Sequence, residues 1–134
     1  MNKSLFKKLI ITDLVVFILI ALKLILYPYS LAPEDLRNAM RMYDEIAPIG
    51  DNFSIIMIFI IFIGYFYSLF QLYRFKKIGR QIYIIVMALA VLSVFSVGYT
   101  VYDPVEYILD CLGSIITGFI IASSYFSKIA KEFK

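Results

Sequence analysis

Three ionisable side chains lie inside long apolar runs, and these are the residues of the sequence that could do chemistry. They are Asp13, Lys23 and Asp110. A charge in hydrocarbon is costly, so such residues usually pair with one another or mark a functional site. Lys23 and Asp110 each lie near the outer end of their run, at a similar predicted depth. We therefore expect an ion pair between Lys23 and Asp110, or, as the alternative, snorkelling of each side chain to the outer interface.

Asp13 lies near the opposite, inner end of the first apolar run. It could form an ion pair with Lys128 or Arg80, or a hydrogen bond with Gln81. The alternative is a proton or cation relay that uses Asp13 and Asp110. Such a relay would suit an oligomeric small channel or transporter.

Catalytic side chains are scarce in this chain, which contains no histidine and a single cysteine, Cys111. The usual general base and the commonest transition-metal ligand are therefore missing. One cysteine cannot form the pair that disulfide exchange needs. The topology resembles that of lipoprotein signal peptidases, but their Asn-x-Ala-Asp type motif is absent. We predict no enzyme activity, no cofactor, and no catalytic or metal-binding residues.

The elements that must position these charges are four long apolar runs. The 134 residues are 62% hydrophobic, with a mean hydropathy of +0.86, whereas soluble proteins are about 45–50% apolar. Each run is long enough for the roughly 20 residues that a membrane-spanning helix needs. The predicted fold class is an all-α membrane protein, a four-transmembrane-helix bundle in a single domain, 1–134. The predicted spans are 9–27, 53–73, 81–102 and 105–127, with an outer loop at 28–52.

The basic residues predict how the bundle is oriented. Ten of the thirteen lie in three short segments: Lys3, Lys7, Lys8, Arg74, Lys76, Lys77, Arg80, Lys128, Lys131 and Lys134. Because Lys and Arg near helix ends are retained on the cytoplasmic side, both termini are predicted to be cytoplasmic. The expected location is a bacterial inner (plasma) membrane. The net charge of +3 reflects this pattern and indicates no nucleic-acid partner.

The outer loop contains a second candidate site. Pro33-Glu34-Asp35 is typical of a helix start, and apolar residues then recur at helical spacing until Pro48 and Gly50. We expect a short amphipathic helix here, which either covers the mouth of the bundle or binds a partner. The predicted partner-binding residues are Leu36, Arg37, Met40, Arg41, Tyr43, Asp44 and Glu45.

The third and fourth spans are predicted to form a tight antiparallel hairpin. Asp103 can cap the last helix, with Pro104 at its first position and Glu106 completing a capping box. A polar seam follows both helices: Ser93, Ser96 and Thr100 on the third, and Asp110, Ser114 and Thr117 on the fourth. Ser114, Gly118 and Ala122 also form a small-residue series. Close helix packing is the expected use of these residues, and a water-filled path is the alternative.

Two segments, 77–83 and 122–127, resemble a pattern found in small uncharacterised bacterial four-helix inner-membrane proteins, a resemblance that implies no activity. With little chain outside the bilayer, the architecture favours recognition. The predicted function is binding of another membrane protein, for example by an immunity protein against a pore-forming toxin. The alternative is an oligomeric small channel or transporter that uses Asp13 and Asp110. The expected partners are the lipid bilayer and either a membrane protein or further copies of this chain.

Overall fold

The computed structural model describes residues 2–26, 34, 51–97 and 104–134. This part of the chain forms four α-helices, a short 3-10 helix and no strand, which confirms the all-helical prediction. The helices are α1 (Lys3–Leu26), α3 (Asp51–Tyr73), α4 (Lys77–Val97) and α5 (Pro104–Phe126), followed by η1 (Lys128–Glu132). The first helix starts several residues earlier than expected. The predicted outer-loop helix and its seven partner-binding residues lie outside the described residues.

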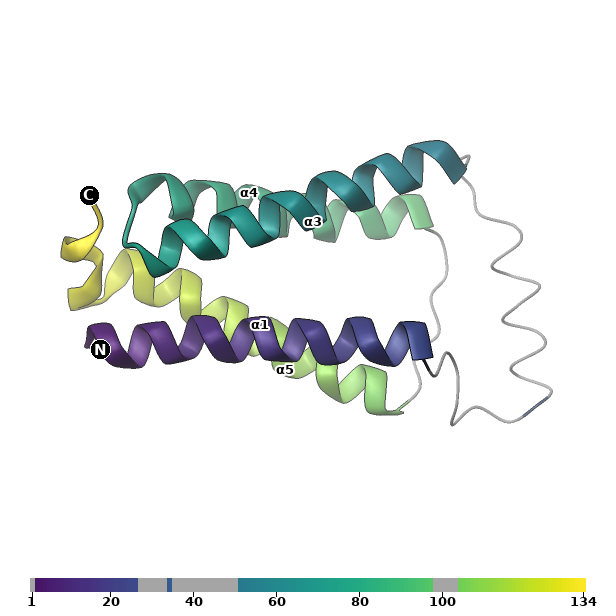
Figure 1. Ribbon diagram of the computed structural model, residues 1–134, viewed down its shortest axis with the longest axis horizontal. Coiled ribbons are helices and arrows are strands. Elements are labelled where there is room, and N and C mark those ends of the chain that lie inside the picture. The colour runs from purple at the N-terminus through teal and green to yellow at the C-terminus, as the bar shows by residue number, and fades with distance from the viewer. Residues whose placement is uncertain (1, 27–33, 35–50, 98–103) are drawn as a thin grey trace.

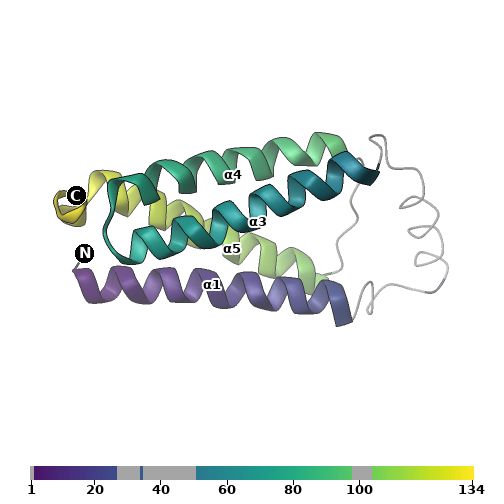
Figure 2. The same ribbon diagram turned by 45° about the horizontal axis from the view of Figure 1, so that its top comes forward.

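The four α-helices lie along one common direction, with both chain termini at one end (Figure 1). We call this the terminal end, and it includes the starts of α1 and α4 and the ends of α3 and α5. The opposite end, where α1 and α4 end and α3 and α5 begin, is the loop end. Both views show the same arrangement (Figure 2).

The helices associate as two antiparallel pairs, α1 with α5 and α3 with α4, and contacts between the pairs are few. The predicted tight hairpin of the third and fourth spans is therefore wrong, because α4 packs along α3. Gly64 explains part of this choice. A Cβ atom at Gly64 would lie 2.7 Å from Cγ2 of Val86, so glycine is what lets α3 approach α4 so closely.

A three-residue turn connects α3 to α4. Phe75 has a positive φ of 56°, and its N–H donates to the Leu72 carbonyl at 2.9 Å. A Cβ atom at Gly79 would lie 2.6 Å from the Leu72 backbone nitrogen. The absence of a side chain at Gly79 therefore allows α4 to fold directly back against the end of α3.

The core lies mainly at the terminal end, where the two pairs meet. The rings of Phe6, Phe75 and Phe133 are in mutual contact, with centroids 5.5–5.8 Å apart. The last residue joins the turn, since the Lys77 N–H donates to the Lys134 carbonyl and the Lys134 N–H donates to the Phe75 carbonyl. These contacts tie the α1–α5 pair to the α3–α4 pair at this end.

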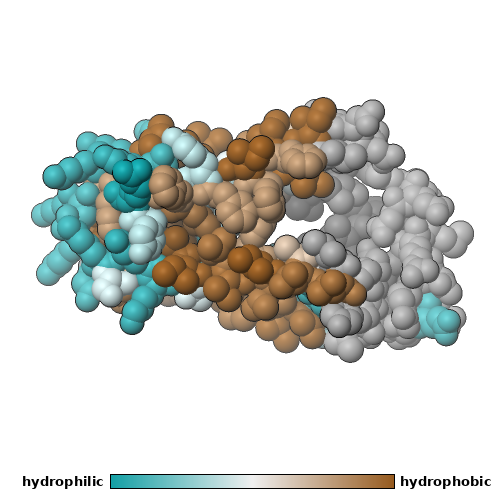
Figure 3. Space-filling model, viewed as in Figure 1, coloured by the Kyte–Doolittle hydropathy of each residue, from teal (hydrophilic) through white to brown (hydrophobic). Residues whose placement is uncertain are grey.

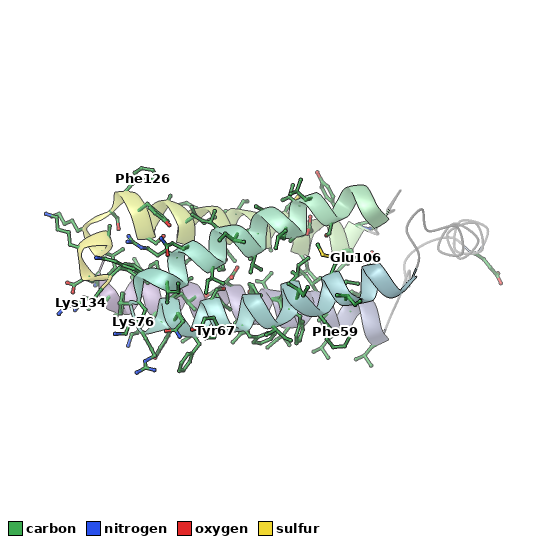
Figure 4. The ribbon with its side chains drawn as sticks, turned by 90° about the horizontal axis from the view of Figure 1, so that it is seen from above. Phe59, Tyr67, Lys76, Glu106, Phe126 and Lys134 are labelled. Atoms are coloured by element: carbon green, nitrogen blue, oxygen red, sulfur yellow. The ribbon has the colours of Figure 1, made fainter. Side chains whose placement is uncertain are left out.

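The surface is apolar along most of the bundle and hydrophilic at the terminal end (Figure 3). Large exposed side chains occur on every helix, among them Leu19, Phe59, Val91 and Phe119. In Figure 4, Phe59, Tyr67 and Phe126 point away from the helices. Meanwhile five polar or charged residues are buried: Asp13, Ser68, Glu106, Ser123 and Ser124. An exposed apolar surface of this extent is unusual for a soluble domain.

Two segments in the described part of the chain are long and apolar enough to cross a membrane, namely Ile56–Tyr73 and Pro104–Phe126. They belong to α3 and α5, the second and fourth predicted spans. Crossing of the membrane by α1 and α4 stays a prediction.

Candidate functional site

Asp13 lies where all four helices meet. It is only 3% exposed, and it sits in the middle part of α1. The Tyr65 hydroxyl on α3 and the Tyr83 hydroxyl on α4 both donate to its Oδ2, at 2.9 and 2.8 Å. The Thr117 hydroxyl on α5 lies 3.5 Å from its Oδ1. We call Asp13, Tyr65, Tyr83 and Thr117 the junction site.

Packing of aromatic rings holds the junction site in place. The ring of Phe17, one turn beyond Asp13 on α1, stacks on that of Tyr65 with centroids 4.5 Å apart. Tyr65 and Tyr83 are 4% and 1% exposed. Buried tyrosine hydroxyls need a hydrogen-bond partner, and the Asp13 carboxylate provides it for both.

The expected partners of Asp13 are wrong. Arg80 instead donates from Nη1 to the Ser124 carbonyl at 2.8 Å and lies over the rings of Tyr125 and Phe133. Lys128 and Gln81 are exposed. Sequence reasoning also missed both tyrosines, which lie within two different apolar runs. The available signal was the phenol group itself, which is rare inside an apolar run unless it is bonded.

Lys23 forms an ion pair with Glu106, at 3.1 Å between Nζ and Oε1. The two side chains are 12% and 6% exposed, and Figure 4 shows Glu106 within the bundle. The predicted Lys23–Asp110 pair is therefore wrong. Glu106 lies one turn nearer the loop end than Asp110 and has a longer side chain, so it reaches Lys23. The prediction that an ion pair joins the first and last spans is correct.

Asp110 is exposed, and its side chain makes no hydrogen bond or ion pair with the described residues. It precedes Thr117 by seven residues, about two turns, so both lie on one face of α5. Thr117 meets α4 through the Tyr83 hydroxyl, at 3.3 Å. Asp110 is therefore on the side of α5 that meets the other pair, but further toward the loop end.

The two pairs separate toward the loop end, and the space-filling view is hollowed between them (Figure 3). We call this space the inter-pair hollow. Because Asp110 shares a face of α5 with Thr117 and lies about two turns nearer the loop end, we infer that Asp110 faces this hollow. Separation of the pairs explains why Asp110 is exposed whereas Thr117 is half-buried. Asp13, at the junction site, lies where the hollow ends.

Other seam residues bond within their own helices. The Ser93 hydroxyl donates to the Ala90 carbonyl, and the Ser124 hydroxyl donates to the Ile121 carbonyl. A Cβ atom at Gly118 would meet nothing within 4 Å, and Ser114 and Ala122 are exposed. The small-residue series is thus not used for packing among the described residues. The side chains of Ser96 and Thr100 lie outside them, and Cys111 is a half-buried free thiol.

The arrangement brings carboxylate and hydroxyl groups together. The junction site offers one carboxylate and three hydroxyl oxygens, and the hollow offers a second carboxylate. No group of three His, Cys, Asp or Glu residues suited to a metal ion occurs in the described ranges. Comparison of the chain with protein-family models, with curated proteins and with solved structures finds no match.

Proposed function

We propose that this chain is an integral membrane protein with four spans and both termini on the cytoplasmic side of a bacterial inner membrane. The apolar surface of all four helices, two of them suited to crossing a bilayer, supports the membrane location. Basic residues gather at the terminal end, at the start of α1, around the α3–α4 turn and after α5, and this supports the orientation. The terminal end then faces the cytoplasm, and the inter-pair hollow opens toward the outer side.

Within this membrane, the proposed function is binding of another membrane protein, without catalysis. The observation that carries the proposal is Asp110, a carboxylate exposed in the hollow of an otherwise apolar bundle. A carboxylate at membrane depth is costly unless it meets a donor or a positive charge. The partner is therefore a protein segment that enters the hollow and presents a cationic side chain to Asp110.

Charge argues against a second copy of this chain as the partner. Two copies in one membrane have the same orientation, so a two-fold axis along the membrane normal would place both Asp110 residues at one depth. Direct pairing of the two hollows would then oppose like charges, which is unfavourable. A different membrane protein with a basic residue fits the site better.

One concrete version is an immunity protein that blocks a pore-forming toxin. A toxin helix that carries a lysine or arginine could lie against α5 and be prevented from joining a pore. The outer loop, with the predicted residues around 36–46, would contact the same partner outside the bilayer. Replacing Arg37, Arg41, Asp44 and Glu45 together tests this loop version, because unchanged partner capture would refute it.

The first experiment is capture of the tagged protein from its native membranes in mild detergent, followed by the mass of the purified particle. We expect one foreign membrane protein in stoichiometric amount. Asp110→Ala should reduce its capture at least about tenfold, since truncating one partner of a buried charge pair costs about 2–5 kcal/mol. Glu132→Gln is the control, because Glu132 is a partly exposed carboxylate at the terminal end, where it pairs with Lys3 at 2.7 Å. A particle with several copies of this chain alone would refute the proposal.

A second candidate function, transport by an oligomer, is favoured by the burial of Asp13 among neutral partners. It predicts that Asp13→Asn alters ion flux in liposomes that contain the purified protein, whereas changes in the outer loop do not. Equal flux in wild-type and variant liposomes would refute the use of Asp13 in transport.

A further inference from the structure

The carboxylate of Asp13 is buried without a positive charge beside it. Its hydrogen-bond partners, Tyr65, Tyr83 and Thr117, are all neutral. Burying an uncompensated ion costs several kcal/mol, and a neutral donor to a charged group returns only about 1.5–3 kcal/mol. The hydroxyl groups therefore offset much of this cost, but among the described residues they supply no positive charge to the carboxylate.

The charged groups on the surrounding helices are engaged elsewhere. On α1, Lys23 pairs with Glu106 of α5. On α4, Arg80 bonds to the Ser124 carbonyl and covers two aromatic rings. Asp110 of α5 is itself acidic, the segment of α3 from Ile56 to Tyr73 contains no charged residue, and the chain has no histidine. None of these groups neutralises Asp13.

The oxygen atoms of the junction site are spaced like the ligands of a small cation. Both tyrosines use Oδ2 of Asp13, which leaves Oδ1 with Thr117 alone at 3.5 Å. The Thr117 and Tyr83 hydroxyl oxygens are 3.3 Å apart. Neighbouring ligands of an octahedral ion bound at 2.3–2.6 Å are separated by about 3.3–3.7 Å. We propose that Asp13 Oδ1, Thr117 and Tyr83 bind a small monovalent cation of the size of Na⁺.

The position of the site indicates how the cation would enter and how it would stabilise the fold. Asp110 lies on the same face of α5 as Thr117, about two turns nearer the loop end, so its negative charge attracts cations into the inter-pair hollow. Asp13 and Thr117 belong to one helix pair and Tyr83 to the other. A bound cation therefore joins the two pairs where their other contacts are few.

The test measures thermal unfolding of the detergent-purified protein by circular dichroism in increasing NaCl, with choline chloride keeping the ionic strength constant. A ligand that binds only the folded state raises Tm with its concentration. We expect a saturable rise with Na⁺, a smaller one with K⁺, and a shift of the Na⁺ response to higher concentration at lower pH, because protons compete for Asp13.

Two variants test whether the rise of Tm with Na⁺ comes from the junction site. Asp13→Asn should abolish it, and Thr117→Val should weaken it at least about fivefold in apparent Na⁺ affinity while keeping both tyrosine hydrogen bonds and thus the fold. Glu132→Gln is the control that keeps the full response. Coincident Na⁺ and choline curves, an equal rise with K⁺, or an unchanged response in Thr117→Val would each overturn the proposal. Partner capture through Asp110 is measured separately and does not depend on the result.

Discussion

The two ends of the bundle are held together by different means. At the terminal end, three phenylalanine rings, Arg80 and the last residues of the chain connect both helix pairs. Toward the loop end, the Lys23–Glu106 ion pair closes only the α1–α5 pair, and Asp110 is exposed between the pairs. The comparison teaches that aromatic, polar and backbone contacts join the two helix pairs at the terminal end, whereas toward the loop end the Lys23–Glu106 ion pair stabilises only one of them.

Breaking the Lys23–Glu106 ion pair should lower the unfolding free energy more than any other change proposed here. Lys23→Ala or Glu106→Ala leaves one buried charge without its partner, which costs about 3–5 kcal/mol of unfolding free energy. The double variant should recover part of that loss, because no charge is then left alone. Thermal unfolding of the three variants in detergent measures the coupling. A double variant that loses the full sum of both single effects would refute a coupled pair.

The terminal end is tested by two phenylalanines close together in sequence. Phe133 is 3% exposed and contacts the rings of Phe6 and Phe75, whereas Phe126 is 89% exposed. Phe133→Ala should lower the unfolding free energy by about 3 kcal/mol, as expected for a buried ring. Phe126→Ala should change it by less than about 0.5 kcal/mol. Equal losses would show that the aromatic cluster does not hold this end together.

Pairing of α3 with α4 is tested by two glycines on different helices. Gly64→Leu should destabilise by about 1–3 kcal/mol, because even a Cβ atom there would lie 2.7 Å from Val86. Gly118→Leu should have little effect on the isolated protein, since its position is open. Circular dichroism melts of both variants measure the difference. A destabilised Gly118→Leu would mean that α5 packs there in the purified particle.

The junction site is tested by removing a single hydroxyl group. Tyr65→Phe removes one hydrogen bond to the Asp13 carboxylate and should cost about 1.5–3 kcal/mol at most, with the stronger Tyr83 contact left in place. Tyr67→Phe, two residues away and 48% exposed, is the matched control and should be neutral. Indistinguishable melting temperatures would show that the Tyr65 bond adds no net stability.

Prediction from sequence succeeded for the elements and failed for their pairing. Hydropathy and helix signals located all four helices, and Pro104 starts α5 as expected. The predicted partner of Lys23, Asp110, lies one helical turn from the actual partner, Glu106. Both residues lie on nearly the same face of α5, so the estimated depth in the membrane could not decide between them. The tyrosines of the junction site were not predicted because each lies within an apolar run. The neighbouring residues in sequence do not indicate which helix a tyrosine hydroxyl will contact.

By itself the sequence determined helicity, the apolar surface and the basic end, because each depends on residue type and spacing along one element. Tertiary structure alone decided that α5 pairs with α1, that Asp13 is shared by four helices, and that Asp110 is left exposed. These outcomes depend on how closely two helices can approach. That distance is decided by single side chains from distant parts of the chain, such as Gly64 against Val86.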